Sequence, residues 1–205
     1  MTLRPDGSLY WPARETLIVA DLHFGKADTF RAAGLPVPGG GAGTLARLAT
    51  ALDATAAARL VVLGDFWHAR DGRTARLLDE LAALRAARPA LAIDLVRGNH
   101  DRAGPPPAGW AASWLSEFVP DPPFCFAHFP EPTPAGYVLA GHLHPGVTVA
   151  GRGREVFRLP CFWFGPAVGV LPAFGSFTGT AQITPAPGDT VGAVADEHVF
   201  LIPTG

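Results

Sequence analysis

Six of the seven histidines, all but His198, lie in short polar clusters that follow strand-like runs. The clusters are Asp21-Leu22-His23, Gly64-Asp65-Phe66-Trp67-His68, Gly98-Asn99-His100-Asp101, Ala127-His128 and Gly141-His142-Leu143-His144. They offer imidazole, carboxylate and amide oxygen but no thiolate, a mixture that suits manganese, iron or zinc better than an all-oxygen calcium or magnesium site. The clusters therefore predict a metal centre and leave the metal open among those three.

The spacing inside two clusters indicates how their side chains could meet. Asp21 and His23 stand two positions apart, and so do His142 and His144. In extended backbone such side chains project to the same side of the chain. Each pair is therefore expected to reach one metal cluster.

Asn99 and His100 are adjacent, so their side chains must project differently. We expect Asn99 to donate its carbonyl oxygen to a metal while His100 faces the substrate. Seven ligand candidates exceed the needs of one tetrahedral zinc, but they suit two ions about 3.5 to 4 Å apart that share a bridging carboxylate, here Asp65. The predicted ligands are Asp21, His23, Asp65, Asn99, His128, His142 and His144.

Strand and helix patterns explain how these clusters could be positioned. Apolar runs at Thr16–Ala20, Leu60–Leu63 and Ala92–Val96 predict buried strands that each end in a polar cluster. Helical spacing between them predicts helices at Thr44–Leu52, with Thr44 as a cap, and at Thr74–Ala87. The alternation implies crossover connections in a partly parallel sheet.

The second half of the chain is predicted to be mostly β. Its strand-like runs are Phe124–Ala127, Tyr137–Ala140, Val147–Ala150, Val156–Leu159 and Val199–Ile202. A length of 205 residues fits one domain spanning 1–205. The predicted fold is an α/β sandwich of two mixed β-sheets flanked by helices (α/β/β/α), with the metals at the strand ends.

Composition and charge narrow the class of protein. Hydrophobic residues make up 48% and charged residues 17%, which is typical of a globular protein, and the net charge of −2 predicts no bulk attraction to polyanions. We expect no membrane association and a cytoplasmic location, because neither a membrane-spanning run nor a signal peptide is evident. Cys125 and Cys161 are expected to be buried thiols.

The five clusters, in this order, resemble the signature of calcineurin-like metallophosphoesterases: D-x-H, G-D, G-N-H-[DE], H and G-H-x-H. The resemblance spans Asp21 to His144. It implies one metal held by Asp21, His23, Asp65 and His144, and a second held by Asp65, Asn99, His128 and His142. It also implies that His100 contacts the phosphate.

Two longer segments narrow the resemblance. Residues 64–68 look like the G-D-x-[FW]-H variant of calcineurin-like DNA repair nucleases, in which the last histidine orients the scissile phosphate. Residues 21–26 (DLHFGK) and 171–179 (LPAFGSFTG) resemble the bacterial DNA ligase-associated metallophosphoesterases, the DNA damage response endonuclease family. That resemblance covers nearly the whole chain and implies a DNA ligase and a helicase as functional partners.

These clusters predict two-metal phosphodiester hydrolysis. Two divalent cations would lower the pKa of a bridging water from about 15.7 toward neutrality and give a hydroxide for in-line attack. His100, with His68 as the alternative, would protonate the leaving oxygen, which is worth roughly a hundred- to ten-thousand-fold in rate. Further predicted roles are substrate contact by Arg97, Arg102 and Lys26, and orientation of His100 or of a ligand by Asp101.

Three functions stay open on the sequence alone. The first is a manganese-dependent phosphodiesterase or nuclease that acts on DNA in repair. The second is a small-molecule phosphatase or cyclic-nucleotide phosphodiesterase, which the small size and acidic net charge would tolerate. The third is an inactive scaffold for repair partners that keeps its metals for stability.

Overall fold

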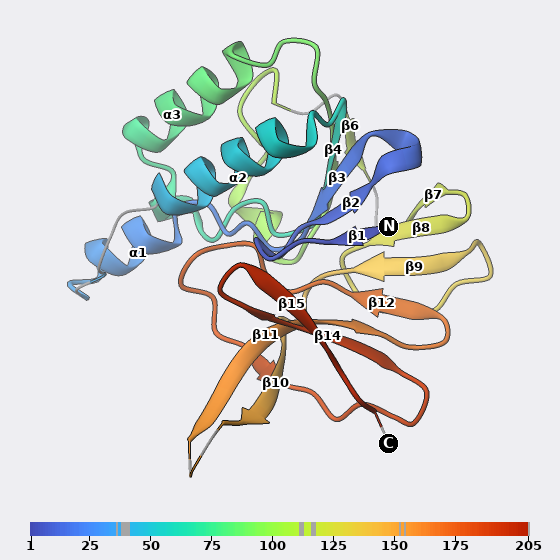
Figure 1. Cartoon of the computed structure of the whole chain (residues 1–205). Helices are drawn as coiled ribbons and strands as arrows, with labels where there is room; N and C mark the ends of the chain where they lie inside the picture. The colour runs from blue at the N-terminus through green and yellow to red at the C-terminus, as the bar shows by residue number, and fades with distance from the viewer. Residues whose placement is uncertain are drawn as a thin grey trace.

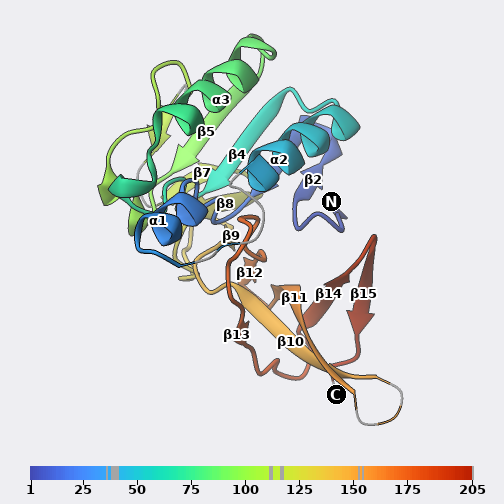
Figure 2. The same cartoon turned by 90° about the vertical axis from the view of Figure 1, so that its left-hand side faces the viewer.

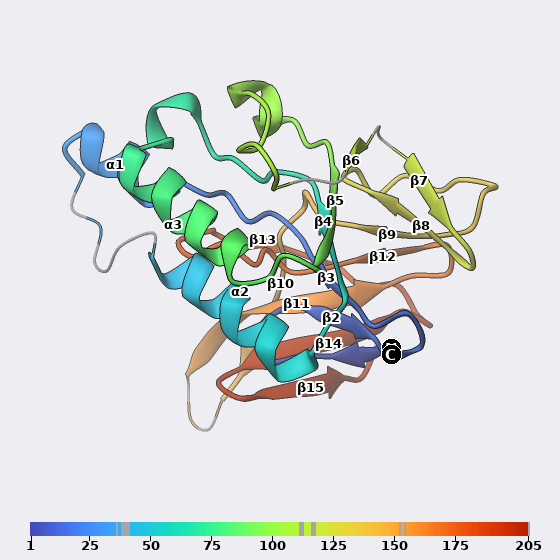
Figure 3. The same ribbon diagram turned by 90° about the horizontal axis from the view of Figure 1, so that it is seen from above.

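Two mixed β-sheets lie face to face, and helices cover the outer face of the first sheet (Figure 1). The computed structural model describes residues 1–35, 37, 42–110, 113–115, 118–151, 153 and 155–204. The predicted α/β sandwich of two mixed sheets is confirmed. Helices Ala42–Thr55 and Ala75–Ala86 run side by side over the first sheet, as Figure 3 shows from above, and helix Lys26–Ala32 contacts the 3-10 turn Arg70–Gly72.

The first sheet has six strands in the order β1-β2-β3-β4-β5-β6. Strands β3 to β6 run parallel to one another, whereas β1 and β2 form antiparallel pairs with their neighbours. The strands are β1 (Thr2–Leu3), β2 (Leu9–Trp11), β3 (Thr16–Val19), β4 (Arg59–Leu63), β5 (Ala92–Val96) and β6 (Ser113–Leu115). The three strands predicted here correspond to β3, β4 and β5. Their carboxyl ends lie at the same edge of the sheet.

The helices of the first half are α1 (Lys26–Ala32), α2 (Ala42–Thr55) and α3 (Ala75–Ala86), with short 3-10 turns at Pro12–Arg14, Arg70–Gly72 and His100–Ala103. Both predicted helices are confirmed, but the prediction that Thr44 caps the first is wrong, because α2 begins at Ala42. The Thr44 hydroxyl instead donates to Ser176 Oγ at 3.1 Å and accepts from the Ser176 backbone N–H at 2.9 Å. It therefore ties the helix to the 171–180 loop.

The second sheet contains the remaining strands, in the order β13-β10-β11-β12-β9-β8-β7, with β14 between β11 and β15. The strands are β7 (Phe118–Asp121), β8 (Phe124–Ala127), β9 (Tyr137–Ala140), β10 (Pro145–Ala150), β11 (Val156–Phe164), β12 (Val168–Val170), β13 (Ala181–Gln182), β14 (Thr190–Ala195) and β15 (His198–Ile202). The five predicted strands are present. Strands β7, β12, β13 and β14 were not predicted, because each is short or contains a proline or a glycine and shows no clear alternation of apolar residues.

Alternate residues of the parallel strands pack into two apolar layers. Leu17 and Val62 face the helices, whereas Ile18 and Val61 face the second sheet. Burial on both faces explains why these strands are continuous apolar runs. Figure 2 shows the second sheet extending beyond the first through β10, β11, β14 and β15. In the described chain, no helix combines the length and apolar character needed to cross a bilayer.

Candidate metal centre

The loops after β3 and β4 remain paired beyond the ends of their strands. Asp21 N–H donates to the Gly64 carbonyl at 3.2 Å, and His23 N–H donates to the Asp65 carbonyl at 2.9 Å. The 171–180 loop adds to this arrangement, because Gly175 N–H donates to the Asp21 carbonyl at 3.0 Å. Backbone hydrogen bonds therefore fix the main chain on both sides of Asp21.

Five predicted ligands adopt left-handed backbone torsions that non-glycine residues rarely use. Their φ angles are 53° at Asp21, 45° at His23, 52° at Asp65, 70° at His142 and 48° at His144. The expectation of extended backbone in the D-x-H and H-x-H segments is therefore wrong. The side chains converge because the strand ends curl, which aims each one into the space between the sheets.

The first group of donors contains Asp21, His23, Asp65 and His144. The Nε2 atoms of His23 and His144 lie 3.4 Å apart, and His144 Nε2 lies 3.6 Å from Asp21 Oδ1. Asp65 Oδ2 lies 3.7 Å from His23 Nε2. The ligand atoms of Asp21, His23 and His144 all fall within 4.8 Å of one another.

The second group contains Asp65, Asn99, His128 and His142. His128 Nε2 lies 3.0 Å from Asn99 Oδ1, 3.1 Å from His142 Nδ1 and 3.6 Å from Asp65 Oδ1. Asp65 thus turns one carboxylate oxygen toward each group. The structure brings together all seven predicted ligands in two groups that share this carboxylate.

The donor set of the second group suits a cation. His128 Nδ1 lies 3.0 Å from the Leu63 carbonyl oxygen, which can only accept, so Nδ1 donates to it. Nε2 is then the ring nitrogen that faces Asn99 Oδ1 and Asp65 Oδ1. Imidazole nitrogen combined with carboxylate and amide oxygen is a donor set that manganese, iron and zinc accept, so these residues fit a bound cation.

Glycines allow the loops to approach the ligands closely. A Cβ at Gly98 would lie 2.2 Å from Asp65 Oδ1, and one at Gly64 would lie 2.3 Å from His128 Nδ1. A Cβ at Gly141 would lie 2.7 Å from Asp21 Oδ2. A side chain at any of these positions would occupy space that a ligand atom now fills.

Burial favours the neutral form of two predicted ligands, His23 and His142. Burial, together with the charges of Lys26 and of the neighbouring histidines, lowers the pKa of His23 to about 2. Burial also lowers the pKa of His142 and raises that of Asp65. Neutral imidazole is the form that binds metals, so protons compete weakly for these ligands near pH 7.

His100 and His68 form a pair beside the first group. Their rings stack with centroids 5.3 Å apart, and His100 Nδ1 lies 2.9 Å from the His68 carbonyl oxygen. Burial lowers the pKa of His68 to about 4, with help from the charge of Lys26. His100 Nε2 is therefore the nitrogen left to meet a substrate. Lys26 begins α1 close enough to act electrostatically on Asp21.

The Asp101 carboxylate joins two loops of the site. It accepts from Trp67 N–H at 3.0 Å and from Gly98 N–H at 2.9 Å, and burial raises its pKa to about 6. Asp101 thus holds the loop after β4 against the loop after β5. The predicted substrate contacts Arg97 and Arg102 are exposed on either side of this segment.

Sequence reasoning did not identify Phe129 as part of the site. Its ring centroid lies 4.6 Å from that of His142 and 4.9 Å from that of His128. Its position directly after His128 was an available signal. The carbonyls of Leu63 and His68, which orient two of the histidines, carry no signal in the sequence, because every residue has such a group.

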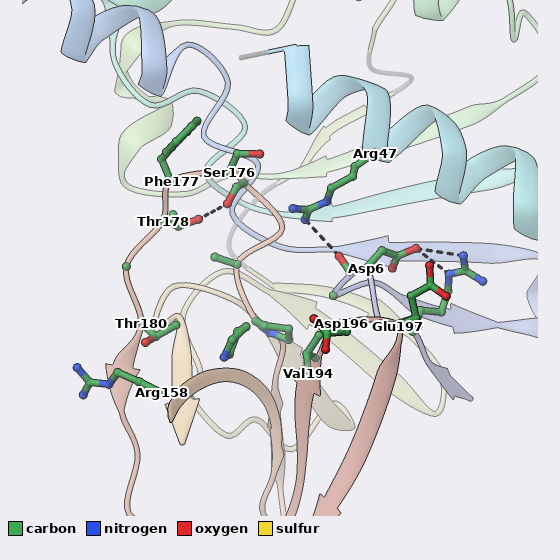
Figure 4. A pocket seen from close by; sticks show the side chains of 18 of the residues that line it. Asp6, Arg47, Arg158, Ser176, Phe177, Thr178, Thr180, Val194, Asp196 and Glu197 are labelled. Carbon is green, nitrogen blue, oxygen red and sulfur yellow. Dashed lines mark hydrogen bonds and ion pairs between the residues drawn. The ribbon is translucent and has the colours of Figure 1, made fainter. Parts of the chain in front are cut away.

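A second cavity, of about 960 Å³, is lined on one side by the 171–180 loop (Figure 4). Its charged side chains have both signs: Arg4, Asp6, Arg47, Arg158, Asp196 and Glu197. Arg47 is already engaged, since it donates to the Phe174 carbonyl at 2.6 Å, and Arg4 pairs with Asp6. None of the seven predicted ligands lines this cavity in the described chain, so it is separate from the metal centre.

This chain is similar to a protein of known structure. No protein-family model matches the chain, and no curated protein matches it. A solved structure, "Crystal structure of Pseudomonas putida nuclease MPE", is 40% identical, with a TM-score of 0.84. The match covers 97% of this chain and 93% of that one. Identity at this level over nearly the full length of both chains shows that this protein belongs to the metallophosphoesterase-like nuclease family that includes the Pseudomonas putida protein.

Proposed function

We propose that this protein is a two-metal phosphodiester hydrolase, a nuclease that acts on DNA. The observation that carries the proposal is the convergence of seven donors into two groups that share Asp65, with Nε2 of His128 facing that carboxylate. The printed name of the Pseudomonas putida relative, a nuclease, supports the choice of a nucleic acid as substrate.

Each group of donors would hold one divalent ion, manganese first, with iron or zinc as alternatives. Asp21, His23, Asp65 and His144 would bind one ion, and Asp65, Asn99, His128 and His142 the other. When bound, the two ions supply Lewis-acid activation of the phosphodiester and of the attacking water. The core shared by the two sheets supports a single catalytic domain over residues 1–205.

The roles of the chain's own residues follow from their contacts. His100, whose Nδ1 is held by the His68 carbonyl, would deliver a proton through Nε2 to the leaving oxygen. Lys26, Arg97 and Arg102 would hold the negative charge of the substrate. Asp101 would hold the loop that carries Asp65 against the loop that carries Asn99, because it accepts a hydrogen bond from the backbone of each.

The biological setting belongs to the same proposal. The likeness of residues 21–26 and 171–179 to the ligase-associated metallophosphoesterases supports a role in DNA repair in the cytoplasm, beside a DNA ligase and a helicase. A pull-down of the purified chain with a ligase and a helicase from the same genome would test these partners.

Turnover of two substrates by the purified chain with manganese tests the proposed reaction. We expect hydrolysis of bis-p-nitrophenyl phosphate and cleavage of single-stranded or nicked DNA, with both lost in Asn99→Ala and His100→Ala. If the chain turns over neither substrate, the result would indicate the inactive scaffold. Hydrolysis of the small diester without DNA cleavage would instead indicate a small-molecule phosphodiesterase.

A further inference from the structure

An open cavity of about 690 Å³ begins at the metal centre, on the side of the second group of donors. Asn99 lines the cavity, and its Oδ1 lies 3.0 Å from His128 Nε2. The cavity therefore adjoins the second group of donors through Asn99. The other cavity, beside Arg47, does not share a ligand residue with the centre.

Two phenylalanines form the apolar part of this cavity. Phe129 stands edge-on to His142 and His128, so the ligand imidazoles hold one side of its ring. Phe118 begins β7 opposite Ala127, which directly precedes His128 in β8. Phe118 remains 37% exposed, although a ring of this size gains free energy from burial. Both rings thus offer apolar surface beside the metal centre.

Positive charge lies on the same cavity. Arg97 and Arg102 line it, and both are exposed. Within the part of the chain that the structure describes, no carboxylate forms an ion pair with Arg102. The carboxylate of Asp101 also borders the space, but it is engaged by the backbone N–H groups of Trp67 and Gly98. The cavity therefore combines aromatic faces with cations.

A nucleotide uses both features, because its base has an aromatic face and its phosphate is an anion. An inorganic phosphate would use only the arginines, and an apolar molecule only the phenylalanines. We propose that this cavity seats the nucleotide next to the cleaved bond, with its base on Phe118 and Phe129 and its far phosphate at Arg102. The inference rests on the proposed nuclease function and adds residues that set its specificity.

Base stacking predicts which substrates this nucleotide site would bind. Every base has a face that can stack, so the site would require a base at that position without selecting its identity. Phe118 is the better residue to change, because Phe129 packs on two metal ligands and its loss could move them. Phe118 belongs to neither group of donors, and the pairing of β7 with β8 places it opposite Ala127, next to His128.

The test measures cleavage of a single-stranded oligonucleotide by the full chain with manganese. Abasic residues replace, one at a time, the nucleotides on either side of the mapped cleavage site and one remote nucleotide. We expect one flanking abasic residue to raise the wild-type KM about tenfold, as loss of one base–aromatic stack would. Phe118→Ala should raise KM for the intact strand about tenfold without changing kcat, and the abasic residue should then raise KM less than it does in the wild type, because only Phe129 still faces the base.

Two matched variants act as controls. Phe118→Trp keeps an aromatic face and should retain the wild-type KM. Phe200→Ala removes another half-exposed ring, 51% exposed on β15 and distant from β7 in the order of the sheet, and should behave as wild type. Bound manganese should equal the wild-type content in all three variants.

The results distinguish a wrong nucleotide site from a wrong proposed function. If the wild type cleaves the strand but Phe118→Ala keeps the wild-type KM, the proposed nucleotide site is wrong and the proposed nuclease function is unaffected. The same conclusion follows if the abasic residue raises KM equally in both proteins. If the wild type hydrolyses bis-p-nitrophenyl phosphate but no oligonucleotide, both the proposed nuclease function and the proposed nucleotide site are wrong.

Discussion

The metal centre and the cavity beside it share Asn99 but hold their residues in different ways. At the centre, Asp21 and Asp65 are almost completely buried and adopt strained torsions. In the cavity, Phe118 and Arg102 are exposed, and neither adopts a left-handed torsion. A centre that must fix charges within a few ångströms requires rigidity, whereas a surface that grips a flexible strand tolerates movement. Changes at the centre should therefore abolish turnover, and changes in the cavity should weaken binding.

Asp65→Asn should have the largest effect, because it removes the charge shared by both groups of donors. A bound metal supplies several kcal/mol of transition-state stabilisation, so kcat for bis-p-nitrophenyl phosphate should fall by at least about a thousandfold. Metal analysis should show less bound manganese. Asp53→Asn is the control, since Asp53 is 68% exposed and pairs with Arg88 on the surface. Wild-type activity and metal content in Asp65→Asn would remove the basis for a shared bridge.

His100→Ala should separate chemistry from metal binding. We expect kcat to fall roughly a hundred- to ten-thousand-fold, which is the usual contribution of a positioned proton donor. Metal content should remain unchanged, because His100 belongs to neither group of ligands. His198→Ala, on the exposed strand β15, provides the control. Loss of manganese together with activity would instead place His100 among the ligands, with His23 and His68.

Gly98→Ala tests how little space the centre allows. Its Cβ would lie 2.2 Å from Asp65 Oδ1, so the carboxylate must move. Displacing a group that orients a ligand costs roughly ten- to a hundredfold in metal affinity, and the manganese concentration for half-maximal activity should rise accordingly. Gly179→Ala is matched to it, because no atom of the described chain lies within 4 Å of a Cβ there. Equal metal dependence in the two variants would show that the centre is less rigid than its geometry implies.

Much of the centre could be predicted from the sequence because its chemistry is local. The clusters after β3, β4 and β5 follow apolar runs that only a buried parallel sheet explains, and the carboxyl ends of such strands meet. The torsions at Asp21 and His142 could not be predicted, since they result from pairing between loops that are distant in the sequence. The spacing of Asp21 with His23 and of His142 with His144 correctly predicted that these side chains meet, but the extended backbone expected there is not what brings them together.

The apolar part of the cavity could not be predicted from the sequence. Phe118 and His128 are ten positions apart, and only the antiparallel pairing of β7 with β8 brings Phe118 opposite Ala127. No periodic pattern marks β7, which contains Pro120 and has no fully buried residue. An exposed phenylalanine is also common on protein surfaces, so its type alone carries little information. The contacts across the sheet are what give Phe118 its place beside the metals.

Arg102→Ala should have the smallest effect and should appear in binding alone. Removing one phosphate contact should raise KM for an oligonucleotide by a few-fold and reduce the slope of log affinity against log salt by about 1. Neither kcat nor the hydrolysis of bis-p-nitrophenyl phosphate should change, because Arg102 would contact the far phosphate, which takes no part in the reaction and which the small diester lacks. Arg76→Ala removes the same charge from α3, where it pairs with Glu80, and should leave the slope unchanged. An Arg102→Ala variant with the wild-type slope would mean that the strand leaves the centre by another path.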